Sequence, residues 1–297
     1  MGKKLNLKIH PDRAREVAKI LTKKLSSEGI FESKKLPDDE IRKIPFKDRE
    51  KLVAVLSLVT ALDYMRDAEK LWQSAVETVK DKELQWIFSP KEVVKKGREE
   101  LKKALLKHKI AMRKDKDTDI WWNISQTIAG DFNGSFLSFF NSFNYMVDKT
   151  YEKLDDKNWH EKFPNLSGRK IFPHWIRILK EKVEDLPFEN IEKLPIPVDV
   201  HVTRATFTTG CITGTYKAKS ITATVRKLVI KVWNEALKDE NIPPVSMFRP
   251  LWLLSKHGCH YRKNGICPKK DKCPVKHLCV DGKVIVSASH VEIDTTL

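Results

Sequence analysis

A single carboxylate stands at the centre of the segment KLPIPVDVHVTRAT, residues 193–206. Two prolines hold the apolar run before it extended, and the residues after Asp199 have the composition of a short helix. Aspartate is a preferred N-cap residue, so Asp199 is expected to cap this helix. His201 and Arg204, which lie about one helical turn apart, follow Asp199 and can bind a flanking phosphate. A carboxylate in this position can also serve acid–base or electrostatic catalysis.

Four of the five cysteines lie in one short C-terminal segment with the spacing C-x7-C-x5-C-x5-C. They are Cys259, Cys267, Cys273 and Cys279. Because nothing in the sequence indicates secretion, a disulfide framework is not expected. Four thiolates spaced singly through one loop suit the corners of a [4Fe–4S] cluster. Structural zinc is the alternative, since three histidines stand nearby, although the C-x-x-C pairs usual in zinc knuckles are absent.

The composition points to a polyanionic partner. The 297 residues include 56 Lys and Arg against 40 Asp and Glu, which gives a formal net charge of +16. An excess of this size usually serves nucleic-acid binding. No apolar run reaches the roughly 18–20 residues that a membrane span needs, and the N-terminus has no signal-peptide h-region. We therefore expect no membrane association and an intracellular location, in the cytoplasm or nucleoid.

The spacing of apolar residues predicts an all-α protein with a loop-rich C-terminus. The hydrophobic fraction of 41% is sufficient for a buried core. Strand signal is confined to residues 282–293, and there is no internal repeat. The predicted helices cover residues 51–79, 90–114, 122–154 with a break at 130–134, 168–186, 200–212 and 221–239.

The order of a helical body, an extended PVD, a helix and a cysteine loop resembles the helix-hairpin-helix DNA glycosylase superfamily. WLLSKHGC, residues 252–259, is similar to the helix that leads into the iron–sulfur loop of endonuclease III. PIPVDVHVTRATFTTGC, residues 195–211, resembles the segment after the hairpin in endonuclease III and in archaeal 8-oxoguanine DNA glycosylases. VLSLVTALD, residues 55–63, stands where these enzymes carry the second helix of their barrel.

This resemblance covers roughly residues 50–280 and implies a two-domain, all-α fold. One domain is a helical barrel with the hairpin, at 51–186. The other joins 1–50 to 187–297 and carries Asp199 and the cysteine loop. The expected partner is double-stranded DNA that contains a damaged base, and a monomer is expected.

The hairpin is expected in FPNLSGRKIFPHWIRIL, residues 163–179. Asn165 stands where the family turn L-P-G-x-G has its first glycine, and Gly168 supplies the second. A backbone with φ > 0 at these residues points N–H groups outward and, with the helix dipole, makes a seat for phosphate. Ser167, Gly168 and Arg169 are therefore expected to contact DNA. The alternative is an ordinary helix start capped by Ser167, which would have the same sequence pattern.

Lys170 matches the lysine of the G-R-K sequence in endonuclease III, so the resemblance implies that it is the nucleophile. Its amine would attack C1′ of the damaged nucleoside, and the resulting Schiff base would permit β-elimination of the 3′ phosphate. Asp199 would help to remove the amine proton and would stabilise positive charge on the sugar. The implied function is a DNA glycosylase with associated AP lyase activity.

Two alternatives stay open at this point. A monofunctional glycosylase for deaminated or mispaired bases would use Asp199 and water, and a non-catalytic, metal-stapled DNA-binding protein would need neither. Among lesions we expect an oxidised base, with 8-oxoguanine ahead of oxidised pyrimidines and deaminated purines third. Base pocket or wedge residues are expected among the aromatic side chains, most of which at helical spacing belong to cores. These candidates are Tyr64, Trp72, Trp122 and Phe136.

Overall fold

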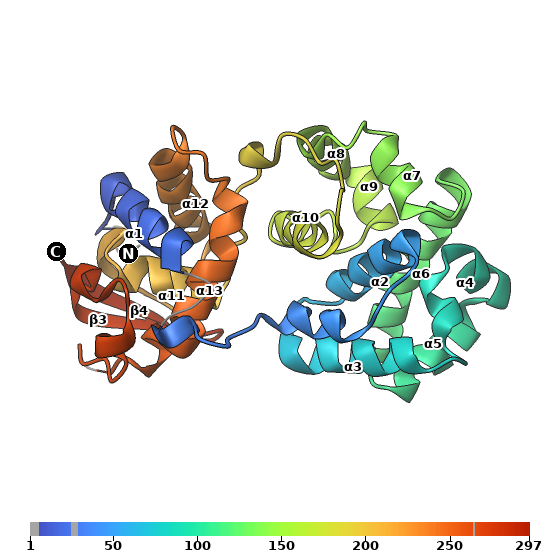
Figure 1. The fold of residues 1–297 in the computed structure, drawn as a ribbon, viewed down its shortest axis with the longest axis horizontal. Helices are drawn as coiled ribbons and strands as arrows, with labels where there is room; N and C mark the ends of the chain where they lie inside the picture. The colour runs from blue at the N-terminus through green and yellow to red at the C-terminus, as the bar shows by residue number, and fades with distance from the viewer. Residues whose placement is uncertain (1–5, 25–28, 264) are drawn as a thin grey trace. The chain divides into compact units, whose positions relative to one another are not determined.

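The computed structural model describes residues 6–24, 29–263 and 265–297. It divides into two compact units (Figure 1). We call residues 37–191 the helical unit, and residues 1–36 together with 192–297 the sheet unit. Within the described ranges, no helix combines the length and the apolar character that crossing a membrane requires.

The helical unit is built from α-helices and short 3-10 helices. Helix α2 is apolar almost all round, as the sequence indicated, and from its second turn onward every residue is buried. The helices are, in chain order, η2 (Pro37–Lys43), α2 (Arg49–Ala61), α3 (Ala68–Lys80), η3 (Gln85–Phe88), α4 (Pro90–Lys96), α5 (Arg98–Lys107), α6 (Lys114–Asp131), α7 (Phe136–Asn141), α8 (Val147–Leu154), α9 (Lys157–Lys162) and α10 (Ile171–Lys182).

Two of the predicted long helices are each divided in two. The helix predicted at 51–79 breaks after α2, where Met65 takes a left-handed backbone with φ of 54°. Asp67 then caps α3 by accepting a hydrogen bond from the amide of Lys70. The helix predicted at 90–114 breaks at Gly97, whose φ of 88° ends α4 and begins α5. The predicted break within 130–134 is confirmed by the end of α6.

A cluster of aromatic rings joins α7 to α10 in the core of the helical unit. The ring of Trp175 lies 5.1 Å from that of Phe140 and 6.1 Å from that of Phe139, centroid to centroid. Its indole N–H donates a 2.8 Å hydrogen bond to the hydroxyl of Ser57 on α2. Because a buried indole needs such a partner, this bond fixes the rotation of α10 against α2.

A buried group of four charges, the ion cluster, joins η2 to α10. Arg177 Nη2 lies 2.9 Å from Asp38 Oδ1, and Lys182 Nζ lies 3.0 Å from Asp38 Oδ2. Lys182 also pairs with Asp39, and all four side chains are buried. Burial alone raises the pKa of the Asp38 carboxyl, but Arg177 and Lys182 together outweigh it and hold this pKa below its usual range.

The sheet unit combines helices with a small antiparallel sheet, and the chain passes between the two units at residues 36–37 and within η4 (Ile191–Lys193). Its elements are β1 (Asn6–Ile9), α1 (Pro11–Lys24), η1 (Gly29–Phe31), α11 (Val200–Thr208), β2 (Ile212–Ala218), α12 (Ala223–Leu237), η5 (Pro244–Met247), α13 (Phe248–His257), η6 (Cys259–Tyr261), η7 (Lys270–Lys272), η8 (Lys276–Leu278), β3 (Asp281–Val286) and β4 (Val291–Thr296).

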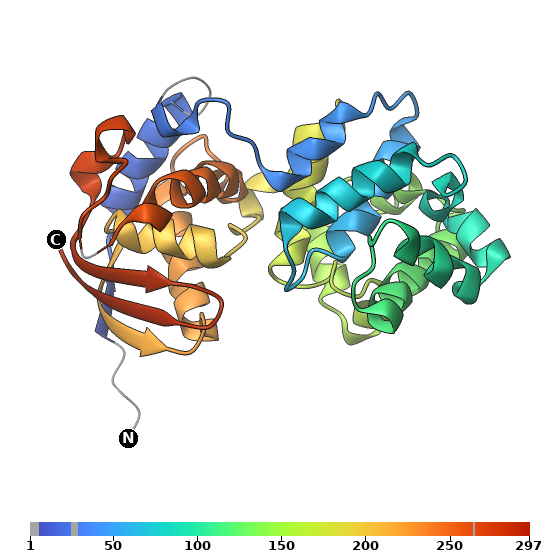
Figure 2. The same cartoon turned by 90° about the horizontal axis from the view of Figure 1, so that it is seen from below.

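The strands run in the order β1-β2-β4-β3, and every neighbouring pair is antiparallel (Figure 2). The all-α prediction is therefore wrong in this unit, because only β3 and β4 lie in the segment predicted as strand. Strand β1 has four residues, too few for a periodic signal. At Gly214 of β2, with φ of 125°, a Cβ atom would clash with the carbonyl oxygen of Asn6, so only glycine lets β1 approach.

Helices α11, α12 and α13 form the core of the sheet unit together with α1 and the inner face of the sheet. Helix α11 packs on α13 and on β3, and α1 packs on α12. The indole of Trp233 on α12 donates a 3.0 Å hydrogen bond to the hydroxyl of Thr206 on α11. The helix predicted at 221–239 is confirmed by α12, whereas the one predicted at 200–212 ends at Thr208 and gives way to β2.

The predicted domain limits at 51 and 186 differ from the limits of these units. Residues 37–50 were placed with the C-terminal part of the chain, but the structure groups them with the helical unit. The physical reason is the ion cluster, because Asp38 and Asp39 have their partners on α10.

Replacement of Asp38 by Asn should destabilise the helical unit by about 3–5 kcal/mol, since it leaves buried cations without their counter-charge. The depressed pKa of Asp38 contributes stability that is present above the ordinary pKa of 3.8 and is lost as pH falls through the folded value. The difference between wild type and Asp38→Asn should therefore shrink below about pH 4. Urea unfolding at several pH values measures both effects.

The matched control is Glu100→Gln, which removes a solvent-exposed partner of Lys103 in the same unit. It should leave the unfolding midpoint unchanged, because exposed ion pairs contribute little. Equal midpoints for Asp38→Asn and Glu100→Gln at pH 7 would contradict the role given to the ion cluster.

Candidate active site

A short connection joins α9 to α10, and buried Phe163 and Leu166 hold it from the inside. The ring of Phe163 lies 4.8 Å from that of Phe139 in the aromatic core. Asn165 has φ of 64°, and its side-chain amide donates a 2.7 Å hydrogen bond to the carbonyl of Ala61 at the end of α2. The left-handed backbone predicted for Asn165 is confirmed.

Gly168 serves this turn in another way than predicted. Its φ is not positive, so the expectation of a left-handed backbone there was wrong. Its amide instead donates a 2.9 Å hydrogen bond to the carbonyl of Asn165, and a Cβ atom would lie 3.0 Å from that same oxygen. Any larger residue would push the two backbones apart, so glycine keeps the turn tight.

The backbone beyond this turn presents unused donors at the start of α10. Within the described residues, the N–H groups of Arg169, Lys170 and Ile171 have no hydrogen-bond acceptor. The first N–H groups of a helix have no partner inside the helix, and its dipole places partial positive charge there. This end of α10 can therefore hold an anion such as a phosphate.

The three residues of this turn that were predicted to contact DNA differ in their exposure to solvent. Ser167 is buried, its hydroxyl lies 2.9 Å from Nδ1 of His160, and its amide donates to the carbonyl of Phe163. Ser167 therefore holds the turn together and does not cap α10. Arg169 is exposed, and Gly168 is half-buried. Contact of these residues with DNA stays a prediction.

Lys170 occupies the N-cap position of α10 and is half-buried. The residues that follow it, Ile171 to Leu179, are all buried, so the helix that carries Lys170 is fixed in the core. The structure gives the Lys170 amine no carboxylate or hydrogen-bond partner among the described residues. An unpaired amine on a fixed backbone is available to react or to bind phosphate.

Asp199 is the N-cap of α11. Its Oδ1 accepts hydrogen bonds from the amides of His201 at 2.9 Å and Val202 at 2.8 Å. The capping role expected from the sequence is confirmed. In the part of the chain that the structure describes, Oδ2 has no hydrogen-bond partner, so one carboxylate oxygen holds the helix while the other can meet a substrate.

His201 and Arg204 both contact Ser255 on α13. Nδ1 of His201 lies 3.3 Å from the Ser255 hydroxyl, and Arg204 Nη1 donates to that hydroxyl at 2.9 Å. The ring of His201 also lies 4.7 Å from that of Trp252 on α13. A second guanidinium nitrogen of Arg204 donates to the carbonyl of Val286.

These contacts bear on the predicted phosphate binding of both residues. Burial, assisted by the cations Arg204 and Lys256, lowers the pKa of His201 to about 4 although Asp199 opposes this. The imidazole is therefore neutral at pH 7 and would meet a phosphate only as a neutral donor. Arg204 keeps its charge but is held in interior hydrogen bonds. Phosphate contact by either stays a prediction.

The cysteine loop, described at residues 258–263 and 265–280, follows α13 as a series of tight turns. The amides of Arg262, Cys273 and Cys279 each donate to a carbonyl three residues earlier, which makes η6, η7 and η8. Arg13 of α1 donates a 2.7 Å hydrogen bond to the carbonyl of Leu278, and the amide of Val280 donates to the carbonyl of Thr208. The loop is thereby attached to α1 and α11.

The four loop cysteines are free thiols that lie close enough to act on one another electrostatically. Burial raises the pKa of Cys259 far above its usual range, and the other three loop cysteines raise it further. Burial likewise raises the pKa of Cys273 to about 11, with further contributions from Cys267 and Cys279. Cys211 lies outside this group, bonded to Thr209. Over the described ranges, no three His, Cys, Asp or Glu side chains are arranged to hold a metal ion.

The sequence model of the AGOG family, described as N-glycosylase/DNA lyase, matches residues 41–277. The chain belongs to the AGOG family. Comparison with curated proteins gave no match. The matched range includes Lys170, Asp199 and three of the loop cysteines, whereas Cys279 and the strands β3 and β4 lie beyond it.

Membership of the AGOG family confirms the resemblance to helix-hairpin-helix DNA glycosylases, and in particular to the archaeal 8-oxoguanine enzymes. The family is one of enzymes that act on DNA, so the alternative of a non-catalytic DNA-binding protein is set aside. The catalytic roles of Lys170 and Asp199 stay predictions.

Burial argues against two of the four predicted base-pocket or wedge residues. Trp72 and Phe136 are 1% and 0% exposed, because both rings pack in the core of the helical unit and leave no face for a base. Trp122 is half-buried, and Tyr64 is 40% exposed in the turn between α2 and α3. Met65, next to Tyr64, is 86% exposed, so this turn can present a side chain to a DNA duplex as a wedge.

Asp199→Ala should lower the free energy of unfolding by about 1 kcal/mol, because the amides of His201 and Val202 lose their acceptor. Asp199→Asn should match the wild type within about 0.5 kcal/mol, since an amide oxygen caps nearly as well as a carboxylate. Urea unfolding of both variants is the measurement. Equal loss in both would show that the negative charge, and not the cap, stabilises α11.

Proposed function

We propose that the protein is a bifunctional DNA glycosylase and AP lyase that removes an oxidised base, with Lys170 as the nucleophile. The observation that supports this most directly is the start of α10. An unpaired lysine amine stands there beside three backbone N–H groups that have no acceptor among the described residues. Nucleophile and phosphate seat lie on one rigid helix, as a strand-cleaving enzyme requires.

The reaction begins when the neutral amine of Lys170 attacks C1′ of the damaged nucleoside. A bond forms between Nζ and C1′ as the bond from C1′ to the base breaks, and the base leaves with the electron pair. Loss of the amine proton and opening of the sugar ring give a Schiff base. Removal of a proton from C2′ then expels the 3′ phosphate by β-elimination, and water releases Lys170.

Asp199 supports the first step through its charge. Its Oδ1 is held by two amides of α11, while Oδ2 has no partner within the described residues. A carboxylate fixed in this way needs no reorganisation when positive charge develops on the sugar. It can also accept the proton that the Lys170 amine loses.

The substrate class we infer is an oxidised base, with 8-oxoguanine ahead of oxidised pyrimidines. Membership of the AGOG family, the PIPVD segment before Asp199 and the long interval from Lys170 to Asp199 support this order. The four-cysteine loop, which resembles endonuclease III, supports oxidised pyrimidines, but such loops contact the DNA backbone more than the base. A monofunctional glycosylase that uses Asp199 and water is the second candidate.

We infer further that the cysteine loop holds a [4Fe–4S] cluster, with zinc as the alternative ion. The chemistry of the donor set suits either, since four thiols share one loop, and burial together with the neighbouring loop cysteines raises the pKa of Cys259 and of Cys273. Bound iron or zinc would stabilise four thiolates that otherwise repel each other. The group would stiffen a basic loop and take no part in the bond-breaking step.

Lys170→Gln should abolish the complex that borohydride traps between the protein and a duplex with a single 8-oxoguanine. Without the amine no Schiff base forms, so strand cleavage should be lost as well. Asp199→Asn, which keeps the helix cap, should lower the rate of base release on the order of 10²-fold. Single-turnover assays with and without alkali separate base release from strand cleavage.

Lys180→Gln is the matched control, because Lys180 is an exposed lysine on the same helix. It should trap like the wild type. Trapping by Lys170→Gln would assign the nucleophile to another lysine. Release of hypoxanthine or uracil without activity on 8-oxoguanine or thymine glycol would overturn the substrate class and leave the glycosylase intact.

Protein purified without oxygen should contain about four iron atoms per chain and absorb broadly near 400 nm, as iron–sulfur clusters do. Cys267→Ser or Cys273→Ser should lose the iron, while Cys211→Ser should keep it, because Cys211 lies outside the loop. Stoichiometric zinc in place of iron would refute the cluster and support the zinc alternative.

A further inference from the structure

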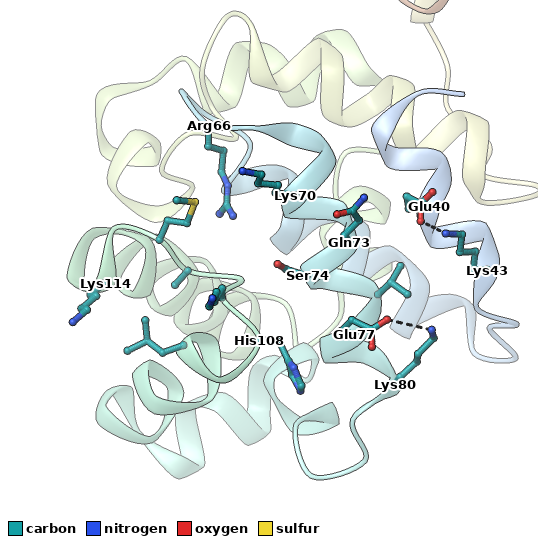
Figure 3. A pocket seen from close by; sticks show the side chains of 15 residues that line it. Glu40, Lys43, Arg66, Lys70, Gln73, Ser74, Glu77, Lys80, His108 and Lys114 are labelled. Carbon is teal, nitrogen blue, oxygen red and sulfur yellow. Dashed lines mark hydrogen bonds and ion pairs between the residues drawn. The ribbon is translucent and has the colours of Figure 1, made fainter. Parts of the chain in front are cut away.

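The helical unit contains a pocket of about 940 Å³ that shares no lining residue with the hairpin. Its walls come from η2, from α3 with Arg66 just before it, and from residues 106–114, where α5 ends and α6 begins (Figure 3). No sequence motif pointed to it, because the three segments lie far apart in the chain.

Positive charge is in excess on the walls of this pocket. The two carboxylates present are already paired, Glu40 with Lys43 and Glu77 with Lys80 (Figure 3). His108 is paired as well, with Asp81 at 2.8 Å. Four cations remain for which the described residues supply no ion pair, and they are Arg66, Lys70, Lys109 and Lys114.

Of these four cations, Arg66 is the best placed to bind an anion in the pocket. Its Nη1 donates a 2.7 Å hydrogen bond to the carbonyl of Ile110, while its Nε is shielded from solvent and has no partner. Burial lowers its pKa, with Asp117 and Asp63 acting against this. A desolvated guanidinium with unused donors is stabilised by an anion that can accept from it.

The carboxylates around Arg66 do not supply that anion. Asp117 accepts two hydrogen bonds from the backbone amides of Met112 and Arg113 and pairs with the Arg113 side chain at 2.7 Å. Asp67 caps α3, and Asp63 lies 3.7 Å from His174. Each has its own partner, so Arg66 faces the pocket with its charge uncompensated by a direct ion pair.

The backbone conformation on both sides of the pocket directs cationic side chains into it. Met65, just before Arg66, and Lys109, on the opposite wall, both have left-handed backbones with φ of 54° and 58°. Non-glycine residues adopt this conformation rarely, and it gathers at ligand-binding positions. Here it turns the chain so that Arg66 and Lys109 reach the same space.

We propose that this pocket binds phosphates of the DNA backbone away from the reacting nucleotide. The inference rests on the proposed function for its choice of DNA as the source of phosphate. The walls support a backbone and not a nucleotide, since they contain no Phe, Tyr or Trp on which a base could stack. Exposed lysine amines that surround a half-buried arginine suit a chain of phosphates, which they hold as point charges.

The test is the salt dependence of binding to an undamaged duplex, measured for the variant Lys70→Gln/Lys109→Gln. Both lysines are exposed, so the variant is expected to fold. Loss of two phosphate contacts should reduce the slope of log K against log salt by about 1.8. The rate of base release at saturating DNA should stay unchanged, because neither residue touches the reacting atoms.

The control variant is Lys82→Gln/Lys95→Gln, which removes two exposed lysines of the same unit outside the pocket. It should change the slope by less than half as much. Equal slopes for the two double variants would overturn the proposal. A second outcome would also overturn it. In that outcome a nucleoside triphosphate stabilises the wild type but not Lys70→Gln/Lys109→Gln, while the salt slope of DNA binding is the same for both proteins.

These readouts separate this proposal from the assignment of Lys170. Binding to an undamaged duplex involves no chemistry, so a reduced slope supports the pocket even if borohydride trapping fails. Normal borohydride trapping together with an unchanged salt slope would refute phosphate binding by the pocket and would leave the proposed glycosylase and lyase activities standing.

Discussion

The ion cluster of Asp38, Asp39, Arg177 and Lys182 is the interaction on which the arrangement of the helical unit depends. Four charges removed from water are tolerated only when all four are present, because any one left alone faces a large desolvation penalty. Their geometry therefore permits a single placement of η2 against the C-terminal half of α10. The aromatic core around Trp175 fixes the other half of that helix.

Both predicted catalytic residues stand at the start of a helix. Lys170 precedes α10 and Asp199 precedes α11, and each helix is buried along most of its length. A helix start combines a fixed backbone with N–H groups that lack internal partners. At α11 the side chain of Asp199 uses those groups for its own orientation, whereas at α10 they stay open for a phosphate. The same local structure thus serves positioning in one place and binding in the other.

The sequence predicted those features that depend on local chemistry. The cap at Asp199, the left-handed Asn165, helix α12 and the break after α6 all follow from residue preferences over a few positions. Prediction from the sequence failed where contacts between distant segments determine the structure. Strand β1 exists because β2 is there to pair with it, and α2 and α3 are separated by a turn that apolar periodicity cannot reveal. The sequence did not predict the basic pocket for the same reason, since its arginine and lysines come from segments forty residues apart.

The pairing of β1 with β2 has a consequence for the order in which the protein can fold. The helical unit is one continuous stretch of chain, so all its contacts are present once residue 191 has left the ribosome. The sheet unit is interrupted by that stretch, and β1 can pair only after β2, its neighbour in the sheet, has been synthesised beyond the helical unit. During translation the N-terminal strand and helix α1 therefore stay without their partners while the helical unit folds. Each completed chain then closes a loop of some two hundred residues to finish its sheet, a slow step for contacts of such sequence separation.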